Sequence, residues 1–376
     1  MLKIGFDAKR LFNNSTGLGN YSRTLISKLK EKYPDNEYLL YTPKVVHNAE
    51  TESFFGQGYE IIKPDSMPGW LWRSAYVANL IKQHKLDIFH GLSHELPMGI
   101  HRTNTCSVVT IHDIIYKFHP EDFPWFDRKV YDYKFRYACE KSDRIIAISE
   151  STKTDIMLHY GVPEDKISVI YQTCNDAFKV GITEEQIEQT LKEYELPSQF
   201  LLYVGTINQR KNLLSIVQAI HQLGDKLKIP LLVIGNGKEY KQQIIDYIKK
   251  NNLESKVVFA PYIQNSHLPS IYHRAKIFIF PSRYEGFGIP IIESLYCRTP
   301  VITSRLSSLP EAAGPGAHYI DIDDASTIAD GILKILSSPE YYKLLVTSGF
   351  EYVQQFNNET ATRSLMGIYE RISAGK

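Results

Sequence analysis

The chain has 376 residues, which exceeds the roughly 250–300 residues at which a single hydrophobic core stops growing, so two domains are expected. Its formal net charge of +1 leaves no global electrostatic footprint for nucleic acid, and no nucleic-acid partner is predicted. The four cysteines, Cys106, Cys139, Cys174 and Cys297, form no CxxC pair, which argues against a zinc ribbon or a disulfide framework and fits a reducing cytosol.

The first residues enter a strand-like run at once, in residues 3–6, without the charged and then apolar regions of a secretory signal. No apolar run reaches the roughly 18 residues that a membrane-spanning helix needs. We therefore expect a cytoplasmic protein, and leave open a peripheral contact with the inner face of the cell membrane.

Short apolar segments alternate with longer helical patterns along the first half of the chain. The expected strands are residues 3–6, 38–41, 87–90, 107–111, 144–148 and 167–170. Helical patterns lie between them near residues 19–32, 70–84, 129–141 and 151–160. These strands are apolar throughout rather than at every second residue, which is typical of parallel sheets that helices cover on both faces.

The second half repeats this rhythm, with expected strands at residues 200–204, 231–234, 256–259, 277–280, 301–303 and 318–320 and helices over 328–371. A polar segment from residue 174 to 198 separates the halves and predicts a hinge. The sequence thus predicts an α/β fold with two Rossmann-like doubly wound domains, residues 1–175 and 176–356. Ligands of such sheets bind beyond the carboxyl ends of the strands, so two such domains facing each other would form a cleft.

The loop after the first strand contains Gly17 and Gly19 and leads into a helical pattern. Two glycines let backbone amides approach a ligand closely, and the start of a helix favours negative charge. Ser22 occupies the third glycine position of a GxGxxG fingerprint, which disfavours a nicotinamide dehydrogenase. A phosphate cradle and a plain tight turn both fit this pattern.

His112 and Asp113 follow the expected strand at residues 107–111. A histidine at the carboxyl end of a strand can bind a sugar hydroxyl or stabilise charge, while the aspartate holds the loop. A packed polar pair is the alternative interpretation.

The loop after residues 200–204 begins with Gly205 and carries two adjacent cations, Arg210 and Lys211, just before a helix. The positive end of a helix repels cations, so this placement favours an anion that lies between them. An arginine fork and a lysine charge can neutralise a departing nucleotide diphosphate without a metal. A solvated surface pair is the alternative.

Residues 281–293 follow another buried strand and combine two carboxylates with two glycines. Gly286 and Gly288 expose backbone donors, and a helix is expected to begin near Pro290. Glu293 lies about one turn inside this helix among apolar residues, where a charge needs partners such as the two ribose hydroxyls. Glu285 lies near the carboxyl end of the strand, where it can accept from the hydroxyls of a sugar.

The spacing Glu285-x7-Glu293, with Gly-Phe-Gly between them and Arg210-Lys211 before them, resembles the family-4 retaining glycosyltransferases of the GT-B fold. The glycine loop and His112-Asp113 match that family's N-terminal motifs, and the resemblance covers essentially the whole chain. It implies an acceptor-binding N-terminal domain, a C-terminal domain that binds the nucleotide-sugar donor, and a last helix near residues 357–376 that packs back on the first domain. The linker departs from the usual Asn-Gly-Val-Asp turn, because residues 172–176 read Gln-Thr-Cys-Asn-Asp.

The resemblance also implies a role for each motif. Arg210 and Lys211 would hold the diphosphate, Glu285 the sugar hydroxyls and Glu293 the ribose, while His112 would lie beside the hydroxymethyl side of the sugar. The implied catalytic residues are His112, Arg210, Lys211 and Glu285. The implied donor-binding residues are Gly17, Gly19, Gly205, Gly235, Gly237, Ile263, Gly286, Phe287, Gly288, Ile289 and Glu293.

No side chain stands out as a covalent nucleophile, because Glu285 and Glu293 are committed to binding. We therefore expect a front-face substitution in which Arg210, Lys211 and a helix end stabilise the leaving diphosphate. No metal and no cofactor are expected. His90-x3-His94 has metal-like spacing, but Pro97 spoils a helix there and no cysteine ligand is near.

The glycine loop and His112-Asp113 are similar to those of bacterial mannosyltransferases that build surface polysaccharides. The expected reaction is therefore transfer of mannose from GDP-mannose to a glycan, a lipid-linked acceptor or a lipid A core. A UDP-sugar-dependent transferase, a nucleotide-sugar epimerase and a non-catalytic nucleotide-sugar-binding scaffold subunit are the alternatives. The aromatic and basic residues between 116 and 137 fit a helix packed on the sheet, and a membrane or acceptor surface is the other interpretation.

Overall fold

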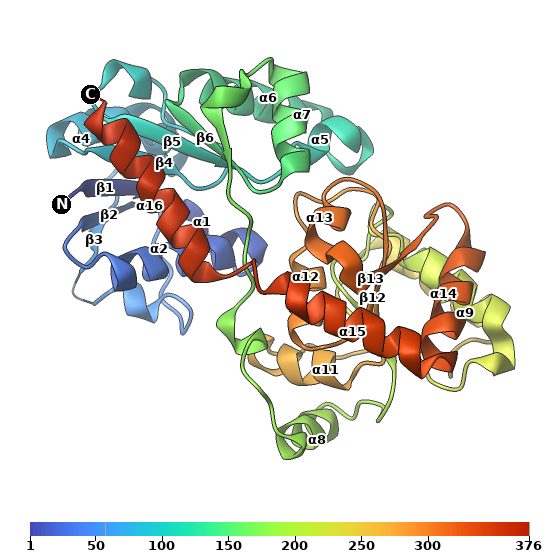
Figure 1. Cartoon of the computed structure of the whole chain (residues 1–376). Helices are drawn as coiled ribbons and strands as arrows, with labels where there is room; N and C mark the ends of the chain where they lie inside the picture. The colour runs from blue at the N-terminus through green and yellow to red at the C-terminus, as the bar shows by residue number, and fades with distance from the viewer. Residues whose placement is uncertain (57, 376) are drawn as a thin grey trace. The chain divides into compact units, whose positions relative to one another are not determined.

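The computed structural model describes residues 1–56 and 58–375 (Figure 1). The chain divides into two compact units. The first consists of Met1–Gln172 and Asn357–Lys376, and the second is Thr173–Phe356. Each unit has its own parallel sheet, so each is described by itself.

The first unit contains a seven-stranded sheet with the order β3-β2-β1-β4-β5-β6-β7, and every recorded strand pair is parallel. Its strands are β1 (Lys3–Asp7), β2 (Glu37–Tyr41), β3 (Glu60–Ile62), β4 (Ile88–Gly91), β5 (Cys106–Ile111), β6 (Arg144–Ala147) and β7 (Ile167–Val169). Alternate residues of β2 enter two different cores, Tyr38 and Leu40 on one face and Leu39 and Tyr41 on the other. Both faces of the sheet are therefore buried, as the apolar strands predict.

Helices cover both faces of this sheet. They are α1 (Lys9–Asn13), α2 (Gly17–Lys32), α3 (Gly69–Leu71), α4 (Val77–His84), α5 (Ile115–Phe118), α6 (Trp125–Lys141), α7 (Glu150–Tyr160) and α16 (Asn358–Ala374), with a π-helical segment at Trp72–Tyr76. Side chains of α2 and α16 share one core, while α4, α6 and α7 contribute to the other. Figure 1 shows α16, in red, lying across the first unit.

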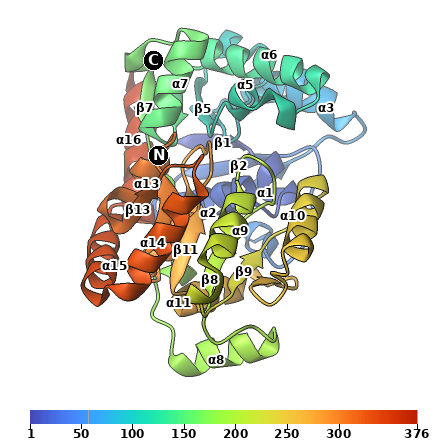
Figure 2. The same ribbon diagram turned by 90° about the vertical axis from the view of Figure 1, so that its right-hand side faces the viewer.

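The second unit contains a six-stranded parallel sheet with the order β10-β9-β8-β11-β12-β13. Its strands are β8 (Leu201–Val204), β9 (Leu231–Ile234), β10 (Val257–Phe259), β11 (Ile277–Phe280), β12 (Val301–Ser304) and β13 (Ala317–Ile320). Its helices are α8 (Glu184–Glu193), α9 (Leu213–Leu223), α10 (Glu239–Lys250), α11 (Leu268–Arg274), α12 (Ile289–Tyr296), α13 (Leu309–Ala313), α14 (Ala325–Ser337) and α15 (Pro339–Val353). Helices α9 and α14 pack against each other (Figure 2).

Short 3₁₀ turns link these elements. They are Glu52–Phe54, Ile100–Arg102, Pro120–Asp122, Glu164–Lys166, Asp176–Phe178, Gly224–Lys226, Asn265–His267 and Gly314–Gly316. Among the described residues, no helix has both the length and the apolar character that crossing a bilayer requires.

The predicted fold class is confirmed, and three local predictions need correction. The edge strand β3, Glu60–Ile62, was not predicted, because one exposed and two half-buried residues are too few to form a pattern. The segment expected to be a polar hinge contains the helix α8, which begins with a capping box between Thr183 and Gln186. Gly17 lies in the first turn of α2 and not in a loop before it.

Strand order gives each sheet one point where the chain reverses its winding direction. In the first sheet this point lies between β1 and β4, and in the second between β8 and β11. Loops at the carboxyl ends of the two strands diverge there and leave a crevice, which is where open α/β sheets bind ligands. These two places therefore locate the functional residues.

Candidate functional site

In the second unit, the loops after β8 and β11 bring two cations onto one carboxylate. Arg210 Nη1 and Lys211 Nζ lie 2.7 and 2.8 Å from Glu285 Oε1. The same oxygen accepts from Ser282 Oγ at 2.8 Å. The three charged side chains are only 11–16% exposed, so water screens the cluster little. Residues 75 positions apart are joined because β8 and β11 are neighbours in the sheet.

The charge state of this cluster follows from its contacts. Burial alone would raise the pKa of Glu285, but the charges of Lys211 and Arg210 outweigh it and hold the pKa at about 2. Glu285 is therefore ionised at neutral pH. The Lys211 ammonium also lies 4.7 Å from the centre of the Phe280 ring, which fixes its position further.

Within the part of the chain that the structure describes, one donor of Arg210 is unsatisfied. Its Nη1 donates to Ser282 Oγ at 3.3 Å and to the Tyr284 carbonyl, but its buried Nε has no hydrogen-bond partner among the described residues. An unsatisfied buried donor is costly and uncommon. It fits an anionic acceptor such as a phosphate oxygen, because a guanidinium binds phosphate through adjacent N–H groups.

Glycines are needed after β9 because the backbone of that loop touches the backbone of the loop after β8. A Cβ on Gly235 would lie 1.9 Å from the Gly205 carbonyl oxygen, and one on Gly237 would lie 2.4 Å from that of Ile207. The Ile207 amide in turn donates to the Asn236 carbonyl at 2.8 Å. Close packing therefore explains these glycines without a ligand, and it places both loops beside Lys211, whose Cδ lies 3.4 Å from the Cβ position of Gly205.

The loop from Glu285 to Gly288 is held by two serines that sequence reasoning missed. Ser307 Oγ accepts from the Glu285 amide at 2.9 Å and donates to its carbonyl at 2.8 Å. Ser308 Oγ lies 2.8 Å from the carbonyl oxygens of Glu285 and Phe287. Both serines follow β12, so their position at the carboxyl end of a neighbouring strand was the signal that could have identified them.

Gly288 caps the helix α12, whose first residue is Ile289. Its φ of 119° is a conformation that side chains rarely adopt, and Pro290 occupies the first turn as predicted. The Phe287 side chain is buried against Phe356, with ring centres 5.2 Å apart, so only its backbone can face a ligand. Ile263, in the loop after β10, is also buried, whereas the neighbouring Tyr262 is 83% exposed.

Glu293 lies one turn inside α12 in an apolar setting. Burial raises the pKa of Glu293 to about 8, although the Tyr272 hydroxyl, which donates to Oε2 at 3.2 Å, opposes this shift. The carboxyl group is therefore mostly protonated at neutral pH. A ligand that donates hydrogen bonds to the carboxylate would favour the ionised form of Glu293 and lower this pKa.

In the first unit, His112 is buried and both of its ring nitrogens are bonded. Gln172 Nε2 donates to Nδ1 at 2.8 Å, and Nε2 donates to the Leu92 carbonyl at 2.8 Å. Burial and the neighbouring His94 lower the pKa of His112 to about 3, so the ring is neutral. These contacts agree with the packed polar alternative, and a ligand would reach the ring nitrogens only by displacing a protein partner.

The two glycines at the start of α2 differ in their surroundings. A Cβ on Gly19 would lie 1.8 Å from the Asn14 carbonyl oxygen, while one on Gly17 would meet nothing within 4 Å. The Gly19 amide donates to Asn14 Oδ1 at 3.0 Å. Gly19 is thus explained by a tight turn whose amide is already bonded, and Gly17 has no such explanation.

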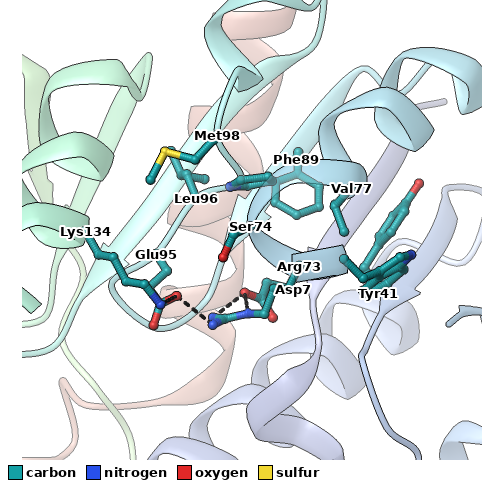
Figure 3. Close-up of a pocket in the computed structure, with 12 residues that line it drawn as sticks. Asp7, Tyr41, Arg73, Ser74, Val77, Phe89, Glu95, Leu96, Met98 and Lys134 are labelled. Carbon is teal, nitrogen blue, oxygen red and sulfur yellow. Dashed lines mark hydrogen bonds and ion pairs between the residues drawn. The ribbon is translucent and has the colours of Figure 1, made fainter. Parts of the chain in front are cut away.

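A second charged cluster, which the sequence did not predict, lies at the carboxyl ends of β1 and β4. Arg73 donates from Nε to Asp7 Oδ2 at 2.7 Å and from Nη1 to Glu95 Oε2 at 2.6 Å, and Lys134 Nζ lies 3.0 Å from the same Glu95 oxygen (Figure 3). These groups line a cavity of about 20 Å³, which holds about one water molecule.

The structure thus joins Arg210, Lys211 and Glu285 directly and places the second-unit glycines, Ile263, Ile289 and Glu293 on the neighbouring loops and on α12. His112, Gly17 and Gly19 belong to the other unit. The histidines with metal-like spacing are used otherwise, since His90 bonds Tyr369 and Thr110, and His94 stacks on Phe135. Over residues 1–56 and 58–375, no group of three metal-ligating side chains is found.

Two family models match the chain, one in each half. Residues 15–177 match the model described as "Glycosyltransferase Family 4", and residues 184–351 match "Glycosyl transferases group 1". The chain is similar to "O-antigen chain mannosyltransferase B" of Escherichia coli, with 25% identity over 98% of this chain and 100% of the relative.

Solved structures share the fold. A glycosyltransferase from Rickettsia africae ESF-5 superposes with a TM-score of 0.77 at 20% identity, covering 99% of this chain and 98% of that one. Anabaena Alr3699/HepE in complex with UDP-glucose also gives a TM-score of 0.77, at 15% identity, covering 99% of this chain and 100% of that one.

Proposed function

The chain belongs to the family 4 and group 1 glycosyltransferases of the GT-B fold, and on that premise we propose that it moves a hexose from a nucleotide diphosphate to a glycan or lipid-linked acceptor with retention of anomeric configuration. Our first choice of donor is GDP-mannose. The name of the E. coli relative supports mannose and a role in bacterial O-antigen or lipopolysaccharide synthesis. The UDP-glucose complex of the Anabaena protein keeps a UDP-sugar as the alternative donor.

The observation that carries this proposal is the cluster of Arg210, Lys211 and Glu285 at the point between β8 and β11 where ligands of such sheets bind. Its two cations are nearly buried, and Arg210 Nε has no hydrogen-bond acceptor among the described residues. A diphosphate supplies that acceptor. The two side chains also provide the positive charge that would otherwise require a divalent metal, so we propose a reaction without metal or cofactor.

We propose a front-face substitution. The bond between the anomeric carbon and the diphosphate oxygen breaks while the acceptor oxygen bonds the same face of that carbon, and the acceptor proton passes to the leaving phosphate oxygen. Arg210 and Lys211 stabilise the charge that grows on the diphosphate. Glu285 Oε1 is occupied by three donors, whereas Oε2 has no hydrogen bond among the described residues and is the oxygen we assign to a sugar hydroxyl.

Glu293 would bind the ribose of the nucleotide. Its carboxyl group is half-buried beside Tyr272, and paired hydroxyls would satisfy the ionised form that burial disfavours. Gly235, Gly237 and Ile263 lie on neighbouring loops of the same unit, and we propose that their backbones flank the base.

The acceptor would bind the first unit, and peripheral contact with a membrane is part of this proposal. One side of α6 carries Trp125, Phe126 and Tyr133, which are 64, 69 and 62% exposed. The same helix carries the exposed cations Lys129 and Arg136. Exposed tryptophan and tyrosine beside cations are typical of segments that lie at a lipid interface. The buried part of α6, with Phe135, Ala138 and Cys139, packs on the sheet as the simpler interpretation expected.

Calorimetric titration with GDP, UDP, GDP-mannose and UDP-glucose, with EDTA present, tests the donor site. Arg210→Ala and Glu293→Ala should each lose tight binding. Arg283→Ala is the matched control, because Arg283 lies in the same loop as Glu285 but pairs with Asp323 at 2.8 Å. The nucleotide that binds identifies the base.

Two outcomes would contradict the proposal. If no nucleotide diphosphate binds, or if Arg210→Ala binds as tightly as Arg283→Ala, the assignment of the diphosphate is wrong and the scaffold alternative gains support. Turnover of the nucleotide sugar into an isomer without any acceptor would instead indicate an epimerase.

A further inference from the structure

The first unit has a second cluster of cations at the place where its sheet should bind a ligand. The chain reverses its winding direction between β1 and β4. Asp7 ends β1, Lys9 and Arg10 begin α1 directly after it, and Glu95 lies in the loop after β4. Arg73, from the π-helical segment Trp72–Tyr76, reaches both carboxylates (Figure 3). The position is thus equivalent, within the first sheet, to that of Arg210 and Lys211 in the second.

The carboxylates of this cluster are already committed. Asp7 accepts from Arg73, and Glu95 accepts from both Arg73 and Lys134, with distances of 2.6–3.0 Å. These four side chains balance one another in charge. They are held between a strand end, a π-helical segment, a loop and the helix α6, so they form a fixed frame rather than a mobile surface.

Lys9 and Arg10 add two positive charges to this balanced frame. Both side chains are half-buried, and across residues 1–56 and 58–375 neither has an ion pair or a side-chain hydrogen bond. Burial is the main cause that lowers the pKa of Lys9. The charges of Arg73 and Arg10 add to this shift, while Glu95 and Asp7 oppose it. Asp7 and Glu95 are already paired with Arg73 and Lys134, so these four groups together with Lys9 and Arg10 carry a net charge of +2, and the desolvation of Lys9 and Arg10 is only partly compensated.

A bound anion would relieve this imbalance. We propose that Lys9 and Arg10 form a phosphate-binding site in the first unit, which takes the phosphate or diphosphate of a lipid-linked acceptor. An arginine fork beside a lysine charge suits phosphate oxygens. This inference rests on the proposed function, which assigns the acceptor to the first unit.

Binding of inorganic pyrophosphate tests the site directly. The protein carries Arg210→Ala and Lys211→Ala, so that the donor site does not contribute. Adding Lys9→Gln and Arg10→Gln should weaken pyrophosphate binding at least about tenfold, the scale of one lost charge-assisted hydrogen bond. Adding Lys82→Gln and Arg102→Gln, which removes the same charge from exposed positions of the same unit, should leave the affinity unchanged. Equal affinities in all three proteins would overturn the site.

Vesicles distinguish the source of the phosphate. Protein with an intact donor site is floated with phosphatidylcholine vesicles that contain a polyprenyl diphosphate, beside vesicles of phosphatidylcholine alone. Recruitment by the diphosphate lipid that is lost in Lys9→Gln/Arg10→Gln supports the acceptor assignment. If that variant instead loses GDP binding and keeps recruitment, the site serves the donor and the acceptor assignment is overturned.

The two proposals can fail separately. GDP binding by Lys9→Gln/Arg10→Gln that equals the wild-type value shows that the variant is folded and that its donor site is intact. Pyrophosphate binding at Lys9 and Arg10 in a protein that binds no nucleotide would reject the donor site and leave the second site standing.

Discussion

Replacing Glu285 by glutamine should destabilise the second unit more than removing either of its cations. The variant keeps the shape of the side chain but leaves Arg210 and Lys211, which are 11 and 12% exposed, without their shared counter-charge. Removing one partner of a buried ion pair costs roughly 3–5 kcal/mol, and we take about 3 because the cluster touches water. For a unit of this size that loss lowers Tm by roughly 6–12 °C. Lys211→Met should cost less, because Arg210 still pairs with Glu285.

Differential scanning calorimetry at several pH values measures the effect. The pKa of Glu285 is depressed from 4.5 to about 2, so its stabilising contribution is complete above about pH 4.5 and is lost as the pH falls towards 2. The Tm difference between wild type and Glu285→Gln should shrink over that window. A Glu285→Gln variant that melts within 2 °C of wild type at pH 7 would refute the reasoning, since the cations would then need no partner.

Three further predictions follow from other contacts. Because the pKa of Glu293 is raised to about 8, binding of a nucleotide through its carboxylate should release a proton. Nucleotide affinity measured by calorimetry should therefore rise with pH up to about 8 and then level off. The variant Glu293→Gln should show no such rise. Gly235→Ala would force a Cβ to within 1.9 Å of the Gly205 carbonyl and should cost roughly 1–3 kcal/mol in urea unfolding, while Gly181→Ala, with nothing within 4 Å, should not. Thr183→Ala removes the capping box of α8 and should cost about 1 kcal/mol without changing turnover, and an unchanged midpoint in urea would contradict this.

The strands could be predicted from the sequence because a strand that is buried on both faces is apolar at consecutive positions. Segments such as Ile277–Phe280 are apolar at every position, which is typical of strands in a parallel sheet that is covered on both faces. The strand β3 shows no such pattern, since it is three residues long and lies at the edge of the sheet. The helix α8 did leave a signal, the pair Thr183 and Gln186, but its many glutamates were interpreted as a solvated hinge.

The site was predictable to the extent that its residues are close in sequence to the strand ends. Arg210, Lys211 and Glu285 each follow a recognisable strand, so adjacency of β8 and β11 brings them together. Ser307 and Ser308 act through backbone groups of another loop. Their position after β12 could have marked them as site residues, but the contacts themselves follow no residue pattern.

The ion pairs of the first unit could not be predicted from the sequence either. Arg73 comes from a π-helical segment that sequence periodicity cannot distinguish from an ordinary helix, so its pairing with Asp7 and Glu95 had no signal. For the two glycines at the start of α2, the pattern was recognised but its cause could not be deduced. A glycine pair predicts a special backbone but does not tell whether a ligand or a neighbouring carbonyl requires it, and for Gly19 the answer is the carbonyl of Asn14.

The discontinuous first unit has a consequence for how the polypeptide is made. Leu365, Met366, Ile368 and Tyr369 of α16 fill the same core as β1 and α2, yet the ribosome adds them only after it has made the whole second unit. Domains usually fold in the order of their synthesis. Here the second unit is synthesised completely before the first unit is. Until α16 is made, part of the apolar core of the first unit stays uncovered. During translation the nascent first unit is therefore the part that should need chaperones, and a ribosome stalled before residue 357 should present it unfinished beside a complete second unit.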